Sequence, residues 1–338
     1  MNRKQSLIST TVIIALVCIV NGCSVQERSL DFPYDHGPHL DSLVEWWYFT
    51  GEIVTSEGQT LGFEFTIFRG WDCTYLDFIY LGHLAISNPM TAEHTFVEVK
   101  TTPPVAGIEE GILEIKISNF SYVFSETKGF IIKADAGNMA VDLTLSPSTD
   151  VLPHGEEGII EMGDGMSCYY YSFTNLQTAG KISINNSEHS LSSGRTWMDH
   201  QWGTFTPFGV IWNWFSLRLE GGSALMLFQF RDSSDHVVRS NWSYQPHTGS
   251  VTYGEEFSLR ATRTYEDEKG NCTYPIDWIV EVADIDAHFQ VEPLFDEQSI
   301  YDVTTPNYWE GLCSVEGTIG DTPVRGSAYV ELTGYENW

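Results

Sequence analysis

Short runs in which apolar and polar residues alternate dominate the chain from residue 45 onward. They are rich in aromatic and β-branched side chains, and clusters of Gly, Asn, Asp and Pro separate them. Alternation with a period of two places one face of each run in a core and is typical of antiparallel strands. No stretch of about ten or more residues has the period of an amphipathic helix. The pattern therefore predicts an all-β protein made of barrels or sandwiches. Clear examples are residues 60–69, 111–117, 130–133, 141–145, 224–230 and 276–282.

The start of the chain has a different pattern. Arg3 and Lys4 precede an apolar run at residues 7–20, which is too short to span a bilayer and is typical of a secretory signal. The run ends at Val-Asn-Gly-Cys23, which resembles a bacterial lipobox. We therefore expect a lipoprotein signal peptide at residues 1–22 and acyl chains, palmitate among them, on Cys23.

The lipid anchor would be followed by a polar tether at residues 23–34. Ser24 rather than an acidic residue follows the cysteine, which in similar lipoproteins permits transfer to the outer membrane. We expect the protein on the periplasmic face of that membrane in a bacterial cell envelope. The alternative is an ordinary secretory signal with an incidental cysteine.

The composition of the chain limits the classes of molecule that the protein is expected to bind. The formal net charge of −29 repels nucleic-acid backbones, so nucleic-acid binding is not expected. The chain has 11 Trp and is 14% aromatic, which is more ring surface than cores alone usually need. A small apolar ligand lying against ring faces is the partner that this composition favours.

The cysteines leave two disulfides open. With Cys23 lipidated, Cys73 and Cys168 remain in one half of the mature chain, and Cys272 and Cys313 in the other. In an oxidising compartment, 73–168 and 272–313 would be natural pairings. No Cys-x-x-Cys spacing occurs, so a zinc ribbon is not supported.

One dense polar and aromatic cluster lies near the mature N-terminus. Asp-His-Gly-Pro-His at residues 35–39 precedes Glu-Trp-Trp-Tyr-Phe-Thr-Gly at residues 45–51. On a strand, Glu45 and Trp47 face one way with Phe49, while Trp46 and Tyr48 face the other. One set can line an interior and the other can pack between domains. A bulky core strand without any function is the alternative.

The second cluster runs from residue 193 to 203. Trp197 and Asp199 share one strand face, and His200 and Trp202 share the other. A carboxyl group packed against tryptophan has a raised pKa that suits a general acid, and a histidine can transfer protons near neutral pH. We take Asp199, His200 and Glu45 as candidate catalytic residues. The alternative is a conformational lock at a domain junction.

Two further positions are ambiguous from the residues alone. Arg69 can pair with Glu45 or Glu64, and His83 has the surroundings of a core histidine. A metal site built from His36, His39, His83 and His200 is conceivable, but the spacing matches no familiar site. We expect neither a metal nor a cofactor. Nucleophile elbows, phosphate loops and dinucleotide fingerprints are missing from the sequence, so a serine hydrolase is not supported.

These clusters resemble the carotenoid 1,2-hydratase / AttH-like family, whose members are often labelled secreted hydrolases. The resemblance extends from about residue 35 to the C-terminus. It rests on the two clusters above and on Tyr-Pro-x-x-Trp at 274–278, Tyr-Trp-Glu-Gly at 308–311 and Tyr-x-Glu-x-Thr-Gly-Tyr at 329–335. It implies two tandem lipocalin-like antiparallel β-barrels, which we place at residues 35–205 and 206–338, with a ligand cavity near their junction.

The resemblance also implies chemistry. The family's hydratases protonate an isolated alkene and capture water on the resulting cation, and His200 and Trp202 match positions that are functional there. Those hydratases also have a Tyr-x-Asp that is thought to supply the proton, where this chain has Phe228-Gln229-Phe230. That departure removes the expected acid.

Two functions follow from the sequence. One is hydratase- or isomerase-type acid–base chemistry on an isoprenoid, polyene or acyl-type ligand, and the other is a non-catalytic lipocalin-type carrier. The ligand-binding residues expected in either case are Trp46, Trp47, Tyr48, Arg69, His83, Trp197, Trp202, Trp212, Trp214, Phe228, Tyr308 and Trp309.

Overall fold

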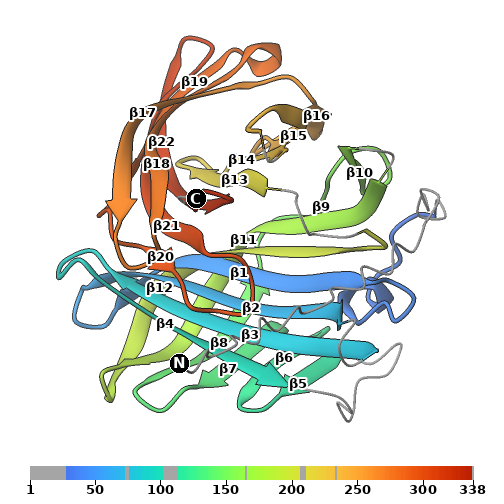
Figure 1. Ribbon diagram of the computed structural model, residues 1–338. Coiled ribbons are helices and arrows are strands. Elements are labelled where there is room, and N and C mark those ends of the chain that lie inside the picture. The colour runs from blue at the N-terminus through green and yellow to red at the C-terminus, as the bar shows by residue number, and fades with distance from the viewer. Residues whose placement is uncertain are drawn as a thin grey trace, which may run out of the picture.

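The computed structural model describes residues 28–72, 76–101, 113–163, 166–205, 211–232 and 234–336. Over these residues the protein is built from β-strands, and only two short 3-10 helices occur, η1 at Tyr34–His36 and η2 at Ala283–Ile285. The strands form two curled antiparallel sheets, one drawn from blue to green and the other from yellow to red in Figure 1. The predicted all-β, two-barrel architecture is confirmed.

The first sheet has the strand order β4-β3-β2-β1-β12-β11-β8-β7-β6-β5, with β9 and β10 paired to β11. Its centre is β1, which pairs with β12 on one side and β2 on the other. The bounds are β1 Val44–Thr55, β2 Thr60–Asp72, β3 Asp77–Asn88, β4 Glu93–Thr101, β5 Glu114–Ile117, β6 Phe120–Ser125, β7 Gly129–Asp135, β8 Met139–Pro147, β9 Leu152–Pro153, β10 Ile159–Gly163, β11 Met166–Ile184 and β12 Ser187–Gly203.

The second sheet has the order β16-β15-β14-β13-β22-β21-β19-β18-β17, with β20 paired to β21. The bounds are β13 Ile211–Leu219, β14 Ala224–Arg231, β15 Val237–Gln245, β16 Thr252–Gly254, β17 Ser258–Asp267, β18 Cys272–Val282, β19 Ala287–Pro293, β20 Ser299–Ile300, β21 Tyr308–Ile319 and β22 Thr322–Thr333.

Side chains fill the interior of the first sheet. Inward-facing residues of its strands form one buried cluster that includes Trp47, Phe49, Phe63, Phe65, Phe120, Tyr122 and Phe130. The packing is close enough that a Cβ on Gly82 of β3 would lie 2.9 Å from the Phe120 ring of β6. This interior is therefore a packed core over most of its length.

The outer faces of the two sheets pack against each other. The residues that alternate with the inner set, such as Tyr48 of β1 and Tyr170 of β11, join Trp214, Phe228 and Tyr329 of the second sheet in a separate buried cluster. A Cβ on Gly62 of β2 would lie 2.5 Å from the Tyr329 hydroxyl, so the sheets approach closely there. Each long central strand therefore serves two cores, one inside its own sheet and one between the sheets.

The expected bridge between Cys272 and Cys313 is not formed. Both are free, buried thiols, and so is Cys168. Their sulfurs donate instead to the carbonyls of Gly270 and Gly311. Cys272 lies on β18 and Cys313 on β21, and β19 separates these two strands in the sheet. Cys73 and the leader with Cys23 lie outside the described residues. Among the residues that the structure describes, no helix is long and apolar enough to cross a membrane.

Candidate functional site

The two sequence clusters are divided between two places in the structure. Glu45, Trp47, His200 and Trp202 face the inside of the first sheet, while Asp199 faces the second sheet, as the alternation predicts. Because the two faces lie on opposite sides of the same strands, the three candidate catalytic residues do not share one site. His200 and Glu45 lie together, and Asp199 lies apart from them.

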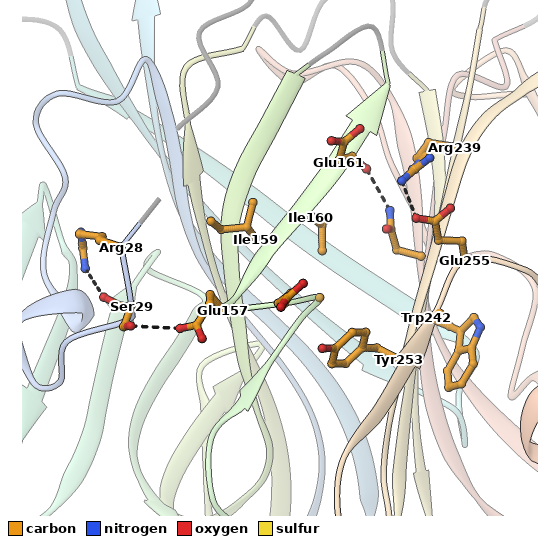
Figure 2. Close-up of a pocket in the computed structure, with 14 residues that line it drawn as sticks. Arg28, Ser29, Glu157, Ile159, Ile160, Glu161, Arg239, Trp242, Tyr253 and Glu255 are labelled. Carbon is orange, nitrogen blue, oxygen red and sulfur yellow. Dashed lines mark hydrogen bonds and ion pairs between the residues drawn. The ribbon is translucent and has the colours of Figure 1, made fainter. Parts of the chain in front are cut away.

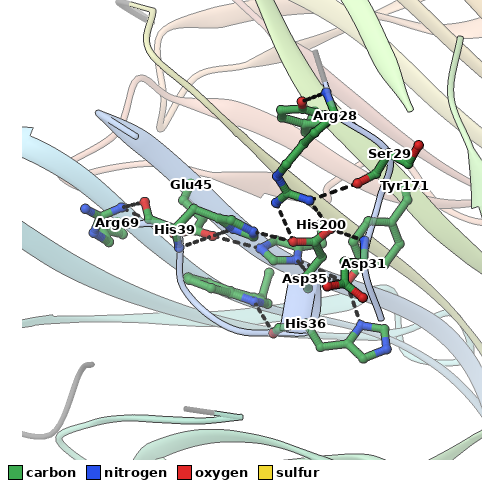
Figure 3. Close-up of polar contacts among 12 residues, drawn as sticks. Arg28, Ser29, Asp31, Asp35, His36, His39, Glu45, Arg69, Tyr171 and His200 are labelled. Atoms are coloured by element: carbon green, nitrogen blue, oxygen red, sulfur yellow. Dashed lines mark hydrogen bonds and ion pairs between the residues drawn. The ribbon is translucent and has the colours of Figure 1, made fainter. Parts of the chain in front are cut away.

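The inner cluster consists of Asp35, His39, Glu45, Arg69 and His200, and it lies at one end of the first sheet (Figure 3). Glu45 Oε1 is 2.7 Å from His39 Nδ1 and 3.0 Å from His200 Nε2. Arg69 donates to the other oxygen of Glu45 at 3.2 Å. Of its two possible acidic partners, Arg69 therefore pairs with Glu45 and lies over the Phe78 ring.

Asp35 holds the opposite edges of both histidine rings. Its Oδ1 lies 3.1 Å from His39 Nε2, and its backbone carbonyl lies 2.9 Å from His200 Nδ1. Arg28 binds the Asp35 carboxylate at 2.5 Å and 2.8 Å. The segment before β1 is thus fastened to β1 and β12 by paired charges.

The charges in the inner cluster are compensated. Burial pushes the pKa of Glu45 upward, but hydrogen bonds from His200 and His39 outweigh it and lower that pKa to about 2. Burial lowers the pKa of His39, but hydrogen bonds to Asp35 and Glu45 outweigh burial, and the pKa of His39 is raised. Burial lowers the pKa of His200 despite Glu45. Both carboxylates are ionised in this cluster.

Aromatic rings enclose the same cluster. Trp202 stacks on His39 with ring centroids 3.8 Å apart, and Trp47 stacks on His200 at 4.8 Å. Tyr171 links His200 to His36 through its hydroxyl, which lies 3.1 Å from one ring and 2.7 Å from the other. Trp47 and Trp202, which share strand faces with Glu45 and His200, therefore lie against the histidine rings of the cluster.

Asp199 lies between the sheets with every oxygen occupied. Ser172 and Trp197 donate to its Oδ1, and Tyr170 donates to its Oδ2 at 2.7 Å. Burial raises the pKa of Asp199 to about 7 although these three bonds oppose the shift. The Tyr170 hydroxyl in turn accepts from the Trp214 indole at 2.9 Å. Asp199 is therefore the acceptor at the centre of a network, and both of its oxygens are engaged by protein donors.

Three glutamates form a second group between the sheets, which we call the interface cluster: Glu64 of β2, Glu310 of β21 and Glu331 of β22. Glu310 and Glu331 are directly opposite each other on neighbouring strands. Tyr48 of β1 donates to Glu310 Oε1 at 2.7 Å, and Thr66 donates to Glu64 Oε1. The second oxygens of Glu310 and Glu64 are buried and have no protein partner.

No Lys or Arg pairs with these glutamates among the ion pairs of the described residues. Burial, followed by the nearby Glu331 and Glu64, raises the pKa of Glu310 well above its ordinary value. Burial raises the pKa of Glu331 to about 8, and a bond from Trp212 opposes the shift. Burial also raises the pKa of Glu64. The cluster therefore tends to retain a proton near neutral pH, and the Glu331 pKa of about 8 is close enough for that residue to be present in part as a carboxylate.

A chain of hydrogen bonds runs from Tyr308, which lies between the sheets, toward the surface. Tyr308 lies 2.6 Å from His83 Nδ1 through its hydroxyl, and His83 Nε2 lies 3.0 Å from Glu98. Glu98 is at the surface, where it accepts from Thr304. His83 is thus a buried and satisfied histidine, and it belongs to the contact between the two sheets.

The predicted ligand-binding residues fall into three groups. Trp47, Arg69 and Trp202 lie inside the first sheet, and Trp309 lies inside the second with its indole donating to Asp296. The remaining residues gather between the sheets: Trp46, Tyr48, His83, Trp197, Trp212, Trp214, Phe228 and Tyr308.

Sequence reasoning missed the interface glutamates as site residues. Glu310 lies within the Tyr-Trp-Glu-Gly motif, of which the sequence predicts only Tyr308 and Trp309 as ligand-binding residues. The available signal was alternation, since Tyr308 and Glu310 must share a face opposite to that of Trp309. Glu64 and Glu331 gave no comparable signal, because their approach to Glu310 depends on how the two sheets pack.

A cleft that is open to solvent lies elsewhere. It has a volume of about 730 Å³ and lies between the segment at Arg28 and Ser29, residues 155–161 at the start of β10, and strands β15 and β16 (Figure 2). Charged and polar groups, among them Arg239 paired with Glu255, line much of it. None of the predicted site residues borders this cleft.

The fold and the buried acids define an all-β protein of two packed sheets with acid–base groups inside and between them. The chain belongs to the AttH-like family, whose model matches residues 24–335. The solved structure of an AttH from Nitrosomonas europaea is 28% identical, with a TM-score of 0.84, covering 92% of this chain and 98% of the other.

Two hydratases are also similar to the chain. Kievitone hydratase of Fusarium solani subsp. phaseoli is 23% identical over 285 residues, which cover 81% of this chain and 75% of the relative. The structure of kievitone hydratase from Nectria haematococca shares the fold, with 18% identity, a TM-score of 0.76, and 92% of this chain and 94% of that chain covered.

Proposed function

We propose that the protein is a hydratase-type lyase that adds water to, or removes it from, a carbon–carbon double bond of a small apolar molecule at the interface cluster. The observation that carries the proposal is the directly opposed pair of Glu310, which is fully buried, and Glu331, which is partly exposed. The pair lies between the two sheets, and no described Lys or Arg forms an ion pair with either residue. Like charges opposite each other on a sheet repel, so the pair retains a proton.

The pair can perform both proton transfers of a hydration. Glu310, as a carboxylic acid, donates its proton to one alkene carbon, and a cation develops on the other. Water bonds to that carbon and releases its proton to the Glu331 carboxylate. The Glu310 proton is now bonded to carbon, and the pair again carries one proton, which came from water and lies on Glu331. Transfer of this proton from Glu331 to Glu310 restores the first state. Dehydration is the same sequence in reverse.

Rings between the sheets suit the cationic intermediate. Tyr48, which holds Glu310, lies edge-on to Trp214 with centroids 5.2 Å apart, and Trp212 bonds to Glu331. Aromatic faces stabilise a nearby cation, and an apolar enclosure limits stray water. Glu331 and Trp212 are partly exposed whereas Glu310 is fully buried, which supports access from the side of Glu331.

Glu310 is a better candidate for the catalytic acid than Asp199 or Glu45, because one of its carboxyl oxygens has no protein partner. Asp199 uses both oxygens to accept three bonds, and Glu45 uses both oxygens on His39, His200 and Arg69. Glu310 Oε2 has no partner and can address a substrate. We assign Asp199 a positioning role, holding Tyr170 and Trp197 in the wall between the sheets. The similarity to kievitone hydratase supports the reaction class.

The test is incubation of the purified chain with kievitone and a panel of isoprenoid and polyene alkenes in heavy-oxygen water, followed by mass spectrometry. We expect one product that gains one labelled water. Glu310→Gln should reduce turnover by about 10²–10⁴-fold, whereas Glu316→Gln, an exposed glutamate of the same strand, should not. Equal activity in wild type and Glu310→Gln would reject the site.

A carrier without turnover is the second candidate. Phe228 and Phe230 lie at the interface between the sheets, at positions where the hydratases that this chain resembles have the Tyr and Asp of Tyr-x-Asp. The absence of that acid favours a carrier. Organic extracts of the protein from its native envelope would then contain an apolar compound that stays unchanged on long incubation. Recovery of an alkene together with its water adduct would instead support the enzyme.

We further propose that Cys23 carries the lipid anchor and that the protein faces the periplasm from the outer membrane. The lipobox-like sequence and Ser24 support this location. Metabolic labelling with an alkyne fatty acid should mark the wild type and not Cys23→Ala. Labelling of both, or of neither, would contradict the anchor.

A further inference from the structure

The histidines of the inner cluster have an unusual arrangement of acceptors. His39 Nε2 and His200 Nδ1 face oxygens of Asp35, one from the carboxylate and one from the backbone carbonyl. The other nitrogens of both rings, His39 Nδ1 and His200 Nε2, converge on Glu45 Oε1. An ionised carboxylate and a carbonyl only accept hydrogen bonds, so each of the four ring nitrogens faces at least one acceptor. His200 Nδ1 also lies 3.1 Å from the Tyr171 hydroxyl, which itself donates to the Asp35 carbonyl.

A neutral imidazole has one N–H to donate. If each ring donates to Asp35, the inward nitrogens of His39 and His200 present lone pairs to a third lone pair on Glu45. Three lone pairs at 2.7 Å and 3.0 Å require something positive between them. Two additional protons satisfy this requirement, and so does one cation with two nitrogen ligands and one oxygen ligand.

We propose that His39, Glu45 and His200 form a binding site for one divalent transition-metal ion of the zinc type. Their ligand atoms all lie within 4.8 Å of one another. Two imidazole nitrogens with one carboxylate oxygen suit zinc and its neighbours in the first transition series, whereas Ca²⁺ and Mg²⁺ prefer oxygen ligands. This site is separate from the interface cluster and does not depend on the proposed function.

The surroundings have the features of a second coordination shell. Metal-bound histidines usually donate their other N–H to a carboxylate or a backbone carbonyl, and Asp35 offers both. Arg69 binds Glu45 Oε2 at 3.2 Å, which leaves Oε1 as the single ligand atom of that carboxylate. The ring of Trp202, stacked on His39, fixes the orientation of the imidazole.

The charge balance is compatible with an ion. Asp35 and Glu45 are matched by Arg28 and Arg69. A divalent ion carries the same charge as the two protons that it would replace. Glu45 and His200 side chains are fully buried, while that of His39 is 12% exposed, so an ion would enter past His39. We infer a structural role, in which the ion ties the segment before β1 to β1 and β12.

The experiment uses the untagged chain, stripped with a chelator and titrated with Zn²⁺ by calorimetry, and with Co²⁺ by visible absorption. We expect one ion per chain and visible bands of a site with nitrogen ligands. His39→Ala should weaken binding by at least about 100-fold. His288→Ala, at an exposed histidine of β19, should bind as the wild type does. No saturable binding, or binding that His39→Ala leaves unchanged, would overturn the proposal.

Wild-type measurements keep the test decisive if His39→Ala does not fold. Saturating Zn²⁺ should raise the melting temperature of the stripped protein, because the ion binds only the folded state. Asp35→Asn should reduce affinity by about 10–100-fold through the second shell. Absence of a thermal shift in the wild type would reject the site. Glu310→Gln should bind Zn²⁺ normally, so this inference and the proposed function can fail separately.

Discussion

The inner cluster and the interface cluster show how burial acts on acids with and without cations. Both contain fully buried glutamates, Glu45 in one and Glu310 in the other. Glu45 has Arg69 and two histidines around it, and its pKa falls to about 2. Glu310 has a tyrosine hydroxyl and two other glutamates, and its pKa rises. Burial alone does not decide whether an acid is ionised, because the neighbouring groups determine the direction in which its pKa shifts.

The difference in ionisation indicates a structural role for Glu45 and a reactive role for Glu310. An ionised carboxylate with four donors or counter-charges is held in place and stabilises the contact between the N-terminal segment and the sheet. A protonated carboxyl group with one free oxygen costs stability but can give up its proton. We therefore expect substitutions in the first cluster to affect stability most and those in the second to affect activity most.

The largest stability effect is expected for Glu45→Gln. Removing this charge leaves Arg69 and the two histidines facing a neutral group in a buried site, which costs about 3–5 kcal/mol. Urea unfolding monitored by tryptophan fluorescence measures the loss.

Glu310→Gln is the matched comparison. It removes an acid that the fold keeps protonated, so its unfolding free energy should lie within about 1 kcal/mol of the wild type or above it. Equal destabilisation by both substitutions would show that the two acids are held in the same way.

A pH-dependent difference is expected for Glu331→Gln. The folded-state pKa of about 8 exceeds the ordinary value of 4.5, so the native state binds this proton more tightly than the unfolded chain does. The stability of the wild type therefore decreases as the pH rises from 4.5 to about 8, and the Glu331→Gln variant does not lose stability in this way.

Thermal unfolding of both proteins across this window checks the sign. The variant should match the wild type at pH 4 and exceed it at pH 8 by about 1–3 kcal/mol, since one pKa unit corresponds to about 1.4 kcal/mol and Glu331 is partly exposed. An advantage at pH 4 that vanishes at pH 8 would contradict the assigned direction.

Tyr48→Phe probes the contact between the sheets. It removes the donor to Glu310 Oε1 and leaves a buried acceptor unpaired, which should cost about 1–3 kcal/mol. Turnover should also fall, because the acid loses the bond that orients it. Unchanged stability, measured by urea unfolding, would mean that water replaces the hydroxyl.

The smallest effect is expected for Arg28→Ala. Arg28 binds Asp35, but its side chain is 43% exposed, so solvent screens the pair. We expect a loss of about 1 kcal/mol or less, measured in the same urea assay. A loss as large as that of Glu45→Gln would show that Asp35 depends on this one arginine.

Alternation along single strands was sufficient to predict the fold class and the face of each cluster residue. Glu45 and Trp47 lie opposite to Tyr48, and His200 lies opposite to Asp199, because the period of two is a property of any strand. The same rule assigned rings to the surroundings of His200. The three candidate catalytic residues therefore do not share one site, because the same rule places Asp199 on the face opposite to that of His200 and Glu45.

The sequence by itself determined which residues are available and which way each strand presents them. Only the tertiary structure decided which faces meet. The pairing of Glu310 with Glu331 depends on the register of β21 and β22, and the meeting of His39 with His200 depends on the return of β12 beside β1. These contacts join residues far apart in the chain, and strand order and sheet packing, which no local pattern encodes, bring them together.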